Sequence, residues 1–312
     1  IGDLHIDNTS ALLDSRLLAY VKRIRPGQLI ESQHLEKTLL VLNDIPGLKV
    51  TASMQPGKRR GSADLMLKVF DLEREGNYLS YDNYGSKSTG RSRFGIEFHY
   101  NNLTNVGDQI SLSGMTSTDD LHNVQLRYSV PVGSDGASLH LTAGQMNYVL
   151  GGQYDYLNAD GLTNTYELGI AIPVRRTYAQ SLFYSVNVRH RDIHDYILSG
   201  AYGTEQASDS IEGDLYGYCR DGRNSFSWTV GHVAGDLSLR RNNYSAPDAV
   251  GNYHKSLADL YYIYDIDRDW QLHLSMSGQY GWTPLDSSEQ FYISGADAVR
   301  AFVQGEAGGR SG

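Results

Sequence analysis

The chain has little of what marks several common protein classes. It contains one cysteine, Cys219, so no disulfide can form within it, and only 7 prolines among 312 residues. No run of about 18 apolar residues occurs, which excludes a membrane-spanning helix. Lys and Arg number 27 against 36 Asp and Glu, and the net charge of −9 argues against a general nucleic-acid-binding protein. A Walker-type phosphate loop is also absent, so neither nucleic acid nor nucleotide is expected as a partner.

What the chain has in abundance is tyrosine and glycine, with 23 Tyr and 33 Gly. Hydrophobic residues make up 40% and charged residues 20%, which is too apolar for a disordered chain. Tyrosine favours pleated surfaces, and scarce proline leaves the donors of a β-ladder in place. The composition therefore predicts a folded protein built mainly of long strands.

Residues 1–73 depart from this pattern and predict a small unit that mixes helices and strands. A short strand over 4–6 precedes a helical pattern over 13–24, and a second helical pattern runs from Ser32 to the break at Pro46-Gly47. Strands are predicted at 48–54 and 64–71, on either side of a turn at 55–61. The predicted order is β-α-α-β-β.

From about Gly76 onward, apolar and polar residues alternate with a period of two. Phe94, Ile96 and Phe98 share one face of a predicted strand, while Glu97 and His99 share the other. Eleven such segments are centred near residues 80, 96, 111, 126, 141, 168, 186, 214, 229, 262 and 275. Most reach about ten residues, which exceeds the usual ~5 to 6 of strands in soluble proteins.

Connection lengths separate a membrane barrel from a soluble sandwich, whose strands alternate in the same way. Short turns at 133–136, 175–178, 221–222 and 267–269 alternate with long connections at 148–162, 193–208, 237–255 and after Trp282. Transmembrane barrels have short periplasmic turns at one rim, long loops at the other, and aromatic girdles at both membrane interfaces. We therefore predict a membrane barrel. Because bacterial barrels close with an even number of strands, further strands are expected after residue 312.

Two motifs resemble metal sites but lack the required geometry. Asp265, Asp267 and Asp269 have the spacing of a calcium loop, but Trp270 stands where that loop needs glycine, so a tight turn is predicted. His190 and His194 are four residues apart, which on a strand separates them by roughly 13 Å. No metal, cofactor or catalytic residue is expected, and the protein is predicted not to be an enzyme.

Several motifs resemble one known family. Residues 42–50, Leu-Asn-Asp-Ile-Pro-Gly-Leu-Lys-Val, and Gln55-Pro56-Gly57 are similar to the second periplasmic POTRA domain of two-partner secretion transporters, the haemolysin/haemagglutinin activation and secretion family. Residues 82–90 resemble that family's first barrel strand and the loop after it. Residues 289–295, followed by Val299, Arg300, Ala301 and Phe302, resemble its sixth external loop with the Val-Arg-Gly-Tyr/Phe signature. Ala301 stands where the family usually has glycine.

The resemblance covers the whole chain and implies both a fold and a function. The implied fold is an α+β POTRA domain over 1–73, followed over 74–312 by an antiparallel transmembrane β-barrel that stops after about eleven of an expected sixteen strands. The implied function is export of a large unfolded β-helical exoprotein, of haemolysin or adhesin type, across the bacterial outer membrane without nucleotide hydrolysis. The POTRA domain would lie in the periplasm, and outer-membrane lipid would surround the barrel.

The same resemblance implies roles for particular residues. The outermost POTRA strand is expected to add a strand of the client at Leu48, Lys49, Val50, Thr51, Ala52, Ser53 and Met54. The pore is expected to be lined by Glu97, His99, Arg127, Arg189 and Arg191. Arg300 is expected to hold a carboxylate in the lumen and so to pin the long loop inside the barrel.

Two other functions stay open at this point. A barrel-assembly factor of the same superfamily would insert other outer-membrane proteins, and such factors usually carry more POTRA domains. A diffusion porin or receptor barrel has no reason to carry a unit like residues 1–73.

Overall fold

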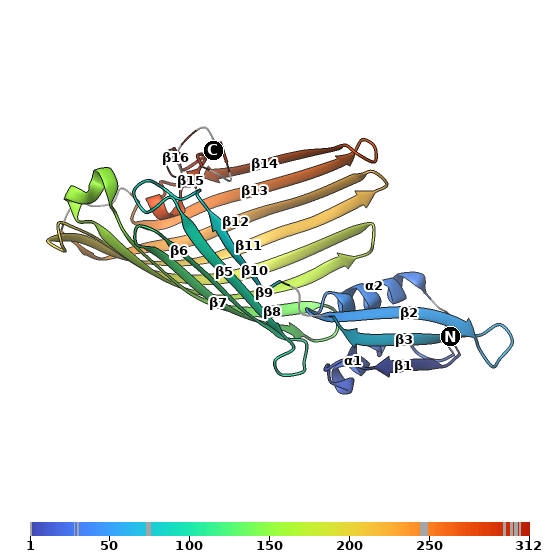
Figure 1. The fold of residues 1–312 in the computed structure, drawn as a ribbon. Helices are drawn as coiled ribbons and strands as arrows, with labels where there is room; N and C mark the ends of the chain where they lie inside the picture. Colours follow the sequence, from blue (N-terminus) through green and yellow to red (C-terminus); the bar gives the residue numbers. More distant parts are fainter. Residues whose placement is uncertain are drawn as a thin grey trace.

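The computed structural model describes residues 2–27, 29, 31–72, 76–243, 249–295, 298–299, 302, 305 and 307–312. An N-terminal α+β unit is joined to a large curved sheet (Figure 1). The unit contains β1 (Leu4–Asn8), α1 (Asp14–Val21), α2 (Ser32–Asn43), β2 (Leu48–Pro56) and β3 (Ala63–Asp71), in the predicted order. Among the described residues, no helix is long and apolar enough to cross a membrane.

The α+β unit has a sheet of order β1-β3-β2, in which β1 is parallel and β2 antiparallel to β3. Both helices turn their apolar residues to one side of this sheet, and the resulting core is well shielded from water. Leu17 on α1 is 1% exposed, and Leu42 on α2 and Leu67 on β3 are both 0% exposed. Burial of a large aliphatic side chain contributes about 1.5 to 3 kcal/mol, so these residues hold the unit together.

The large sheet has eleven strands, and each one contains the centre of a predicted segment. The strands are β4 (Tyr78–Asp82), β5 (Arg93–Asn101), β6 (Gln109–Ser117), β7 (Leu121–Val132), β8 (Ala137–Val149), β9 (Asp160–Arg176), β10 (Gln180–Ile197), β11 (Tyr202–Asp221), β12 (Asn224–Asn242), β13 (Gly251–Asp265) and β14 (Gln271–Gly281). Every strand is antiparallel to its sequence neighbours, from β4 at one edge to β14 at the other. The sheet is therefore an up-and-down meander.

Two predicted connections were wrong in their bounds. The predicted connection 237–255 is shorter, because β12 continues to Asn242 and β13 begins at Gly251. The sequence pattern indicated a long connection over 193–208, but β10 ends at Ile197 and β11 begins at Tyr202. Ile193 and Gln206, both inside the predicted connection, are directly paired within the ladder. Their segments lack the apolar alternation because these strands, of 18 and 20 residues, exceed the ~9 to 11 residues that cross a bilayer.

The two faces of the sheet differ in chemistry. On the convex face of β5, Phe94, Ile96 and Phe98 are 52%, 48% and 41% exposed. On the concave face of the same strand, Glu97 and His99 are half-buried and bonded to each other at 2.8 Å. A soluble monomer rarely exposes a continuous apolar surface of this extent, so the convex face is suited to lipid.

The α+β unit contacts the rim of the sheet that carries the short turns. Arg176, at the end of β9, binds the Asp44 carboxylate with both Nε and Nη2, at 2.9 and 2.7 Å. Arg23 pairs with Asp135 in the β7–β8 turn at 2.7 Å, and the Leu13 N–H donates to Asn105 O in the β5–β6 turn. Three successive turns at this rim therefore hold the unit.

Candidate functional site

The concave face of the large sheet brings together charged residues from successive strands. The register places one row of paired residues across β5 to β10: His99, Ser111, Arg127, Thr142, Glu167 and Arg189. Glu97 lies on the same face of β5, and its second partner is the Tyr78 hydroxyl. Of the five residues predicted to line a pore, four are thus placed on this face, and Arg191 follows Arg189 by one strand repeat.

Opposite charges are matched within this wall. Arg189 lies 2.7 Å from Glu167 on β9 and 3.3 Å from Glu212 on β11. His140 on β8 approaches the other Glu167 oxygen at 3.4 Å. The concave face is therefore strongly polar, and its charged side chains have partners of opposite charge nearby. Such a surface is suited to a water-filled interior.

The segment after β14 folds back onto the concave face and is held there by Glu289. The short helix η2 (Ser287–Glu289) ends at Glu289, whose side chain is 7% exposed. Arg191 pairs with it from β10, and Lys255 on β13 approaches at 2.8 Å. The Tyr253 hydroxyl donates to Glu289 at 3.0 Å. Two cations and a phenol from two strands, β10 and β13, thus converge on one carboxylate of the returning segment.

Main-chain and apolar contacts support the same attachment. The Glu289 carbonyl accepts hydrogen bonds from Lys255 and from Gln279 on β14, at 3.1 and 3.0 Å. Leu285 is 6% exposed because it packs on Val233 and Leu237 of β12. The segment is therefore fixed to the wall by both polar and apolar contacts.

The signature residues of the predicted loop lie farther along this segment. The strands β15 (Phe291–Tyr292) and β16 (Gly308–Gly309) pair antiparallel in a small two-stranded sheet. Val299 forms a bridge with Ser294, and Val299 and Phe302 are 48% and 56% exposed. The predicted residues Arg300 and Ala301 lie outside the described residues.

The predicted client-binding edge is β2, which pairs only with β3 among the described strands. Leu48 and Val50 are buried, whereas Lys49, Thr51, Ala52, Ser53 and Met54 are exposed. The Asn43 side chain accepts from the Val50 N–H at 2.9 Å and donates to its carbonyl at 3.0 Å. Because alternate residues of an antiparallel strand point their polar groups the same way, the open part of this edge begins at Ala52.

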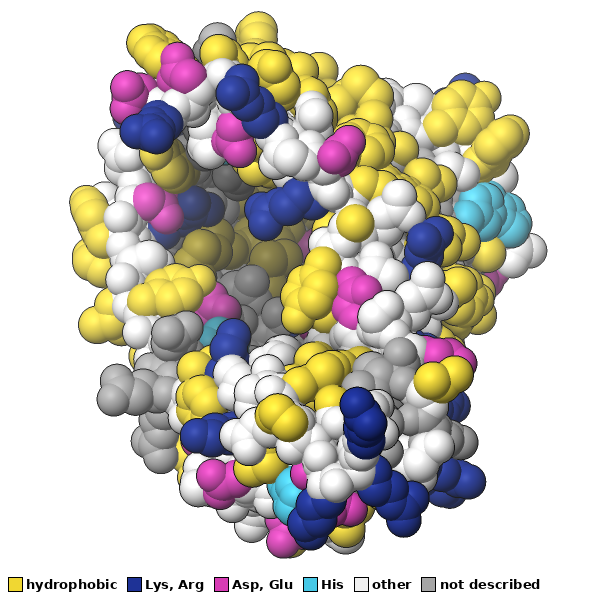
Figure 2. Space-filling model, turned by 90° about the vertical axis from the view of Figure 1, so that its right-hand side faces the viewer, with side chains coloured by type: hydrophobic (Ala, Val, Ile, Leu, Met, Phe, Trp, Pro, Cys, Tyr) yellow, Lys and Arg dark blue, Asp and Glu magenta, His cyan; other side chains and the backbone are white. Residues whose placement is uncertain are grey.

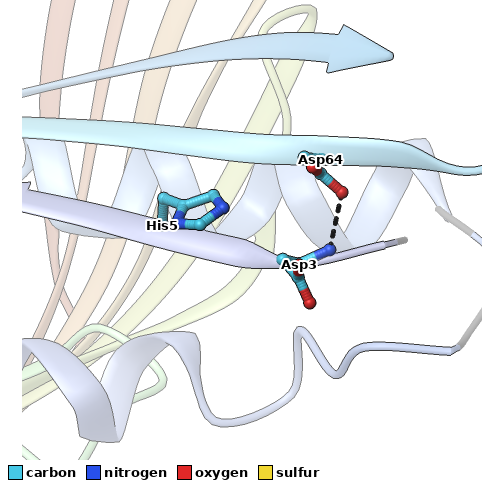
Figure 3. Close-up of side chains that lie close together, drawn as sticks. All are labelled: Asp3, His5 and Asp64. Carbon is cyan, nitrogen blue, oxygen red and sulfur yellow. Dashed lines mark hydrogen bonds between the residues drawn. The ribbon is translucent and has the colours of Figure 1, made fainter. Parts of the chain in front are cut away.

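One group of possible metal ligands occurs among the described residues, at Asp3, His5 and Asp64 (Figure 3). The Asp64 carboxylate already accepts a hydrogen bond from the Asp3 N–H at 2.8 Å, and Lys58 lies 3.6 Å from the Asp3 carboxylate. The group is largely exposed, and its acids have partners in the chain.

In the β13–β14 turn, Asp267 accepts from the N–H groups of Asp269 and Trp270, as in a tight turn.

Figure 2 shows the molecule from the short-turn end, where a hollow opens above the α+β unit with Lys and Arg side chains in its wall. The concave face of the sheet therefore bounds an open interior rather than a packed core.

Comparisons with known proteins identify the family. The family model described as haemolysin secretion/activation protein ShlB/FhaC/HecB matches residues 61–312. The chain belongs to this family.

Individual relatives agree with this assignment. The heme/hemopexin transporter protein HuxB of Haemophilus influenzae is 26% identical over 98% of the chain and 56% of its own length. The outer membrane transporter CdiB of Dickeya dadantii is 22% identical over 92% of the chain and 53% of its own length. The chain thus spans about half the length of these curated relatives.

Solved structures show the same fold. CdiB from Escherichia coli superimposes with a TM-score of 0.80 at 20% identity, covering 100% of the chain and 60% of that structure. CdiB from Acinetobacter baumannii gives 0.79, also at 20% identity, over 100% and 59%. The resemblance expected from the sequence motifs is confirmed at the level of family and fold.

Sequence reasoning placed Arg191 in the pore but missed the contacts that hold the returning segment. Glu289 was part of a recognised motif, but its partners Arg191, Tyr253 and Lys255 lie far away in the chain. The sequence offered little signal for Lys255, because this residue falls in the predicted long connection 237–255, where a charged side chain needs no partner.

Proposed function

We propose that this chain is part of an outer-membrane transporter that exports an extended exoprotein through the interior of its barrel, without nucleotide hydrolysis. The observation that carries the proposal is a sheet with an apolar convex face and a charged concave face, whose short-turn rim holds an α+β unit. Family membership and the two CdiB structures support the same function.

In this proposal residues 1–73 form a periplasmic POTRA domain, and residues 74–312 form the first strands of the barrel and the start of its sixth external loop. The client would be a large secreted protein of haemolysin or adhesin type that folds as a β-helix after export. Outer-membrane lipid would cover the convex face.

The α+β unit would receive the client first. An extended peptide can add a strand to an exposed sheet edge, because main-chain hydrogen bonds give affinity with little demand on sequence. The open part of β2 from Ala52 onward offers such an edge. The client would then pass Glu97, His99, Arg127, Arg189 and Arg191, and the returning segment at Glu289 would have to move or leave space beside it.

The decisive experiment disrupts the gene that encodes this chain in its native host and follows its secreted partner protein. We expect the exoprotein to disappear from the medium and to return when the full-length transporter is supplied. Unchanged secretion in the disrupted strain, with intact assembly of other outer-membrane proteins, would refute the proposal. A general loss of outer-membrane proteins would instead indicate a barrel-assembly factor.

A further inference from the structure

Two stacked aromatic rings lie near the short-turn end of the concave face. Phe183 on β10 is directly opposite Tyr216 on β11, and their ring centroids are 5.1 Å apart with planes 8° from parallel. Both side chains are half-buried, so part of each remains accessible. Beside this pair the β9–β10 register shifts, with Leu182 opposite Arg175 and Phe183 opposite Pro173, so the extra residue, Val174, lies on β9.

This pair belongs to the lining of two clefts. The first cleft, of about 350 Å³, lies between the α+β unit and the sheet, and its walls include Tyr20, Val41 and Pro46 from the unit. The second cleft, of about 480 Å³, extends along the sheet and includes Tyr218 and Tyr261. Because Phe183 and Tyr216 line both clefts, they mark the passage from the unit to the interior.

The lining combines ring faces with hydroxyl groups. Besides its rings, the second cleft offers the hydroxyls of Ser227, Thr229, Ser275 and Ser277. Aromatic faces attract apolar and aromatic side chains, while hydroxyls both donate and accept hydrogen bonds, as an extended main chain requires. Neither cleft has room for a folded domain, so the occupant that fits is a single extended polypeptide.

The first cleft lies beside the start of β2, the strand that carries the client-binding edge of the proposed function. Pro46 lines the cleft, and β2 starts two residues later at Leu48. The open part of this edge begins at Ala52, so a peptide paired there would have to extend past Val50 to reach the cleft.

We propose that Phe183 and Tyr216 form an aromatic platform that binds apolar and aromatic side chains of the extended exoprotein as it moves from the α+β unit into the barrel. This inference rests on the proposed function and specifies which side chains of the client the transporter would bind along the export path.

The test measures export by the full-length transporter carrying F183A and Y216A together. We expect the export rate to fall about tenfold, in line with the loss of two aromatic contacts. Y184A is the matched control, because Tyr184 is the next residue on β10 and is 41% exposed on the opposite face. F183Y keeps a ring and is expected to export normally. Heat-modifiable gel migration checks that each barrel is assembled.

A second measurement does not depend on losing a side chain. Benzoylphenylalanine at position 216 keeps an aromatic ring and should form a photo-crosslink to exoprotein that is stalled during export. Alanine in place of the client's aromatic and aliphatic residues near the stalled position should remove the crosslink.

The outcomes separate the two proposals. If the wild-type transporter exports no exoprotein, the proposed function fails. If wild type and the double variant export at equal rates, the platform is refuted while the function stands. A crosslink from position 216 to the transporter itself, and none to the client, also refutes the platform.

Discussion

The attachment of the returning segment through Glu289 leads to a quantitative prediction. E289Q keeps the size of the side chain and the main-chain bonds but removes the charge that faces Arg191 and Lys255. Leaving buried charges without their partner costs about 3 to 5 kcal/mol. The lumen is wet, so we expect the lower end, about 3 kcal/mol, which shifts the equilibrium toward the detached segment by roughly 100-fold.

Cysteine reactivity can measure this equilibrium. Val233 is 2% exposed beneath Leu285, so V233C in a C219S background should react with a maleimide only when the segment leaves the wall. When opening and closing are fast, the labelling rate follows the open population. We expect E289Q to raise that rate by about 100-fold.

The control and the refuting result are equally specific. Glu205 pairs with Arg241, whose side chain is 56% exposed, so E205Q removes a surface pair and should change labelling less than about fivefold. A double-mutant cycle of E289Q with K255M should show coupling between the two residues. If E289Q leaves the V233C labelling rate unchanged, Glu289 does not hold the segment.

Four further predictions concern the unit and the loop. R176A should weaken the attachment of the α+β unit by about 1 to 3 kcal/mol, because it removes a bidentate ion pair. R23A removes only an exposed ion pair and should weaken the attachment by less than ~1 kcal/mol. Distances between spin labels on the unit and on the rim of the sheet would show the difference. Asp108, in the β5–β6 turn, is buried, which by itself would raise its pKa, but donors from neighbouring residues outweigh burial and hold the pKa below its ordinary value of 3.8. The ionised Asp108 carboxylate therefore stabilises the folded turn at pH values above its pKa in the unfolded chain, and this stabilisation is lost as the pH falls through the lower pKa of the folded chain. We expect amide exchange in this turn to accelerate at such acidic pH in the wild type but not in D108N. A52P removes an edge donor of β2 without breaking the ladder and should weaken client binding, while A52V should not; equal peptide affinities would exclude this edge. R300A should strongly reduce exoprotein in the medium while the barrel still inserts, and a normal yield would refute its role.

The fold could be read from the sequence to a large extent, because its patterns are local. A strand that separates lipid from water must alternate with a period of two, and this alternation located every strand from β4 to β14. The helical spacing of Leu17 and Val21, and the breaks at proline and glycine, likewise located the elements of the α+β unit. The alternation also assigned Arg127 and Arg189 to one face.

Strand ends were less accessible to sequence reasoning. Where β10 and β11 extend past the lipid-facing region, their outward residues become polar and resemble a loop, although the ladder continues. Hydropathy reports the surroundings of a side chain, whereas the end of a strand depends on hydrogen bonds to its neighbour.

The contacts that shape the candidate site were decided only by the tertiary structure. Asn43 occupies the polar groups of Val50 and so limits the open edge of β2, and Arg176 meets Asp44 across 132 residues of chain. Glu289 meets Arg191 across nearly a hundred residues. Such pairs leave no periodic trace in a sequence, because they depend on the curvature and register of the whole sheet. The amino-acid order thus determined the strands and their two faces, and the folded chain determined which charges meet inside.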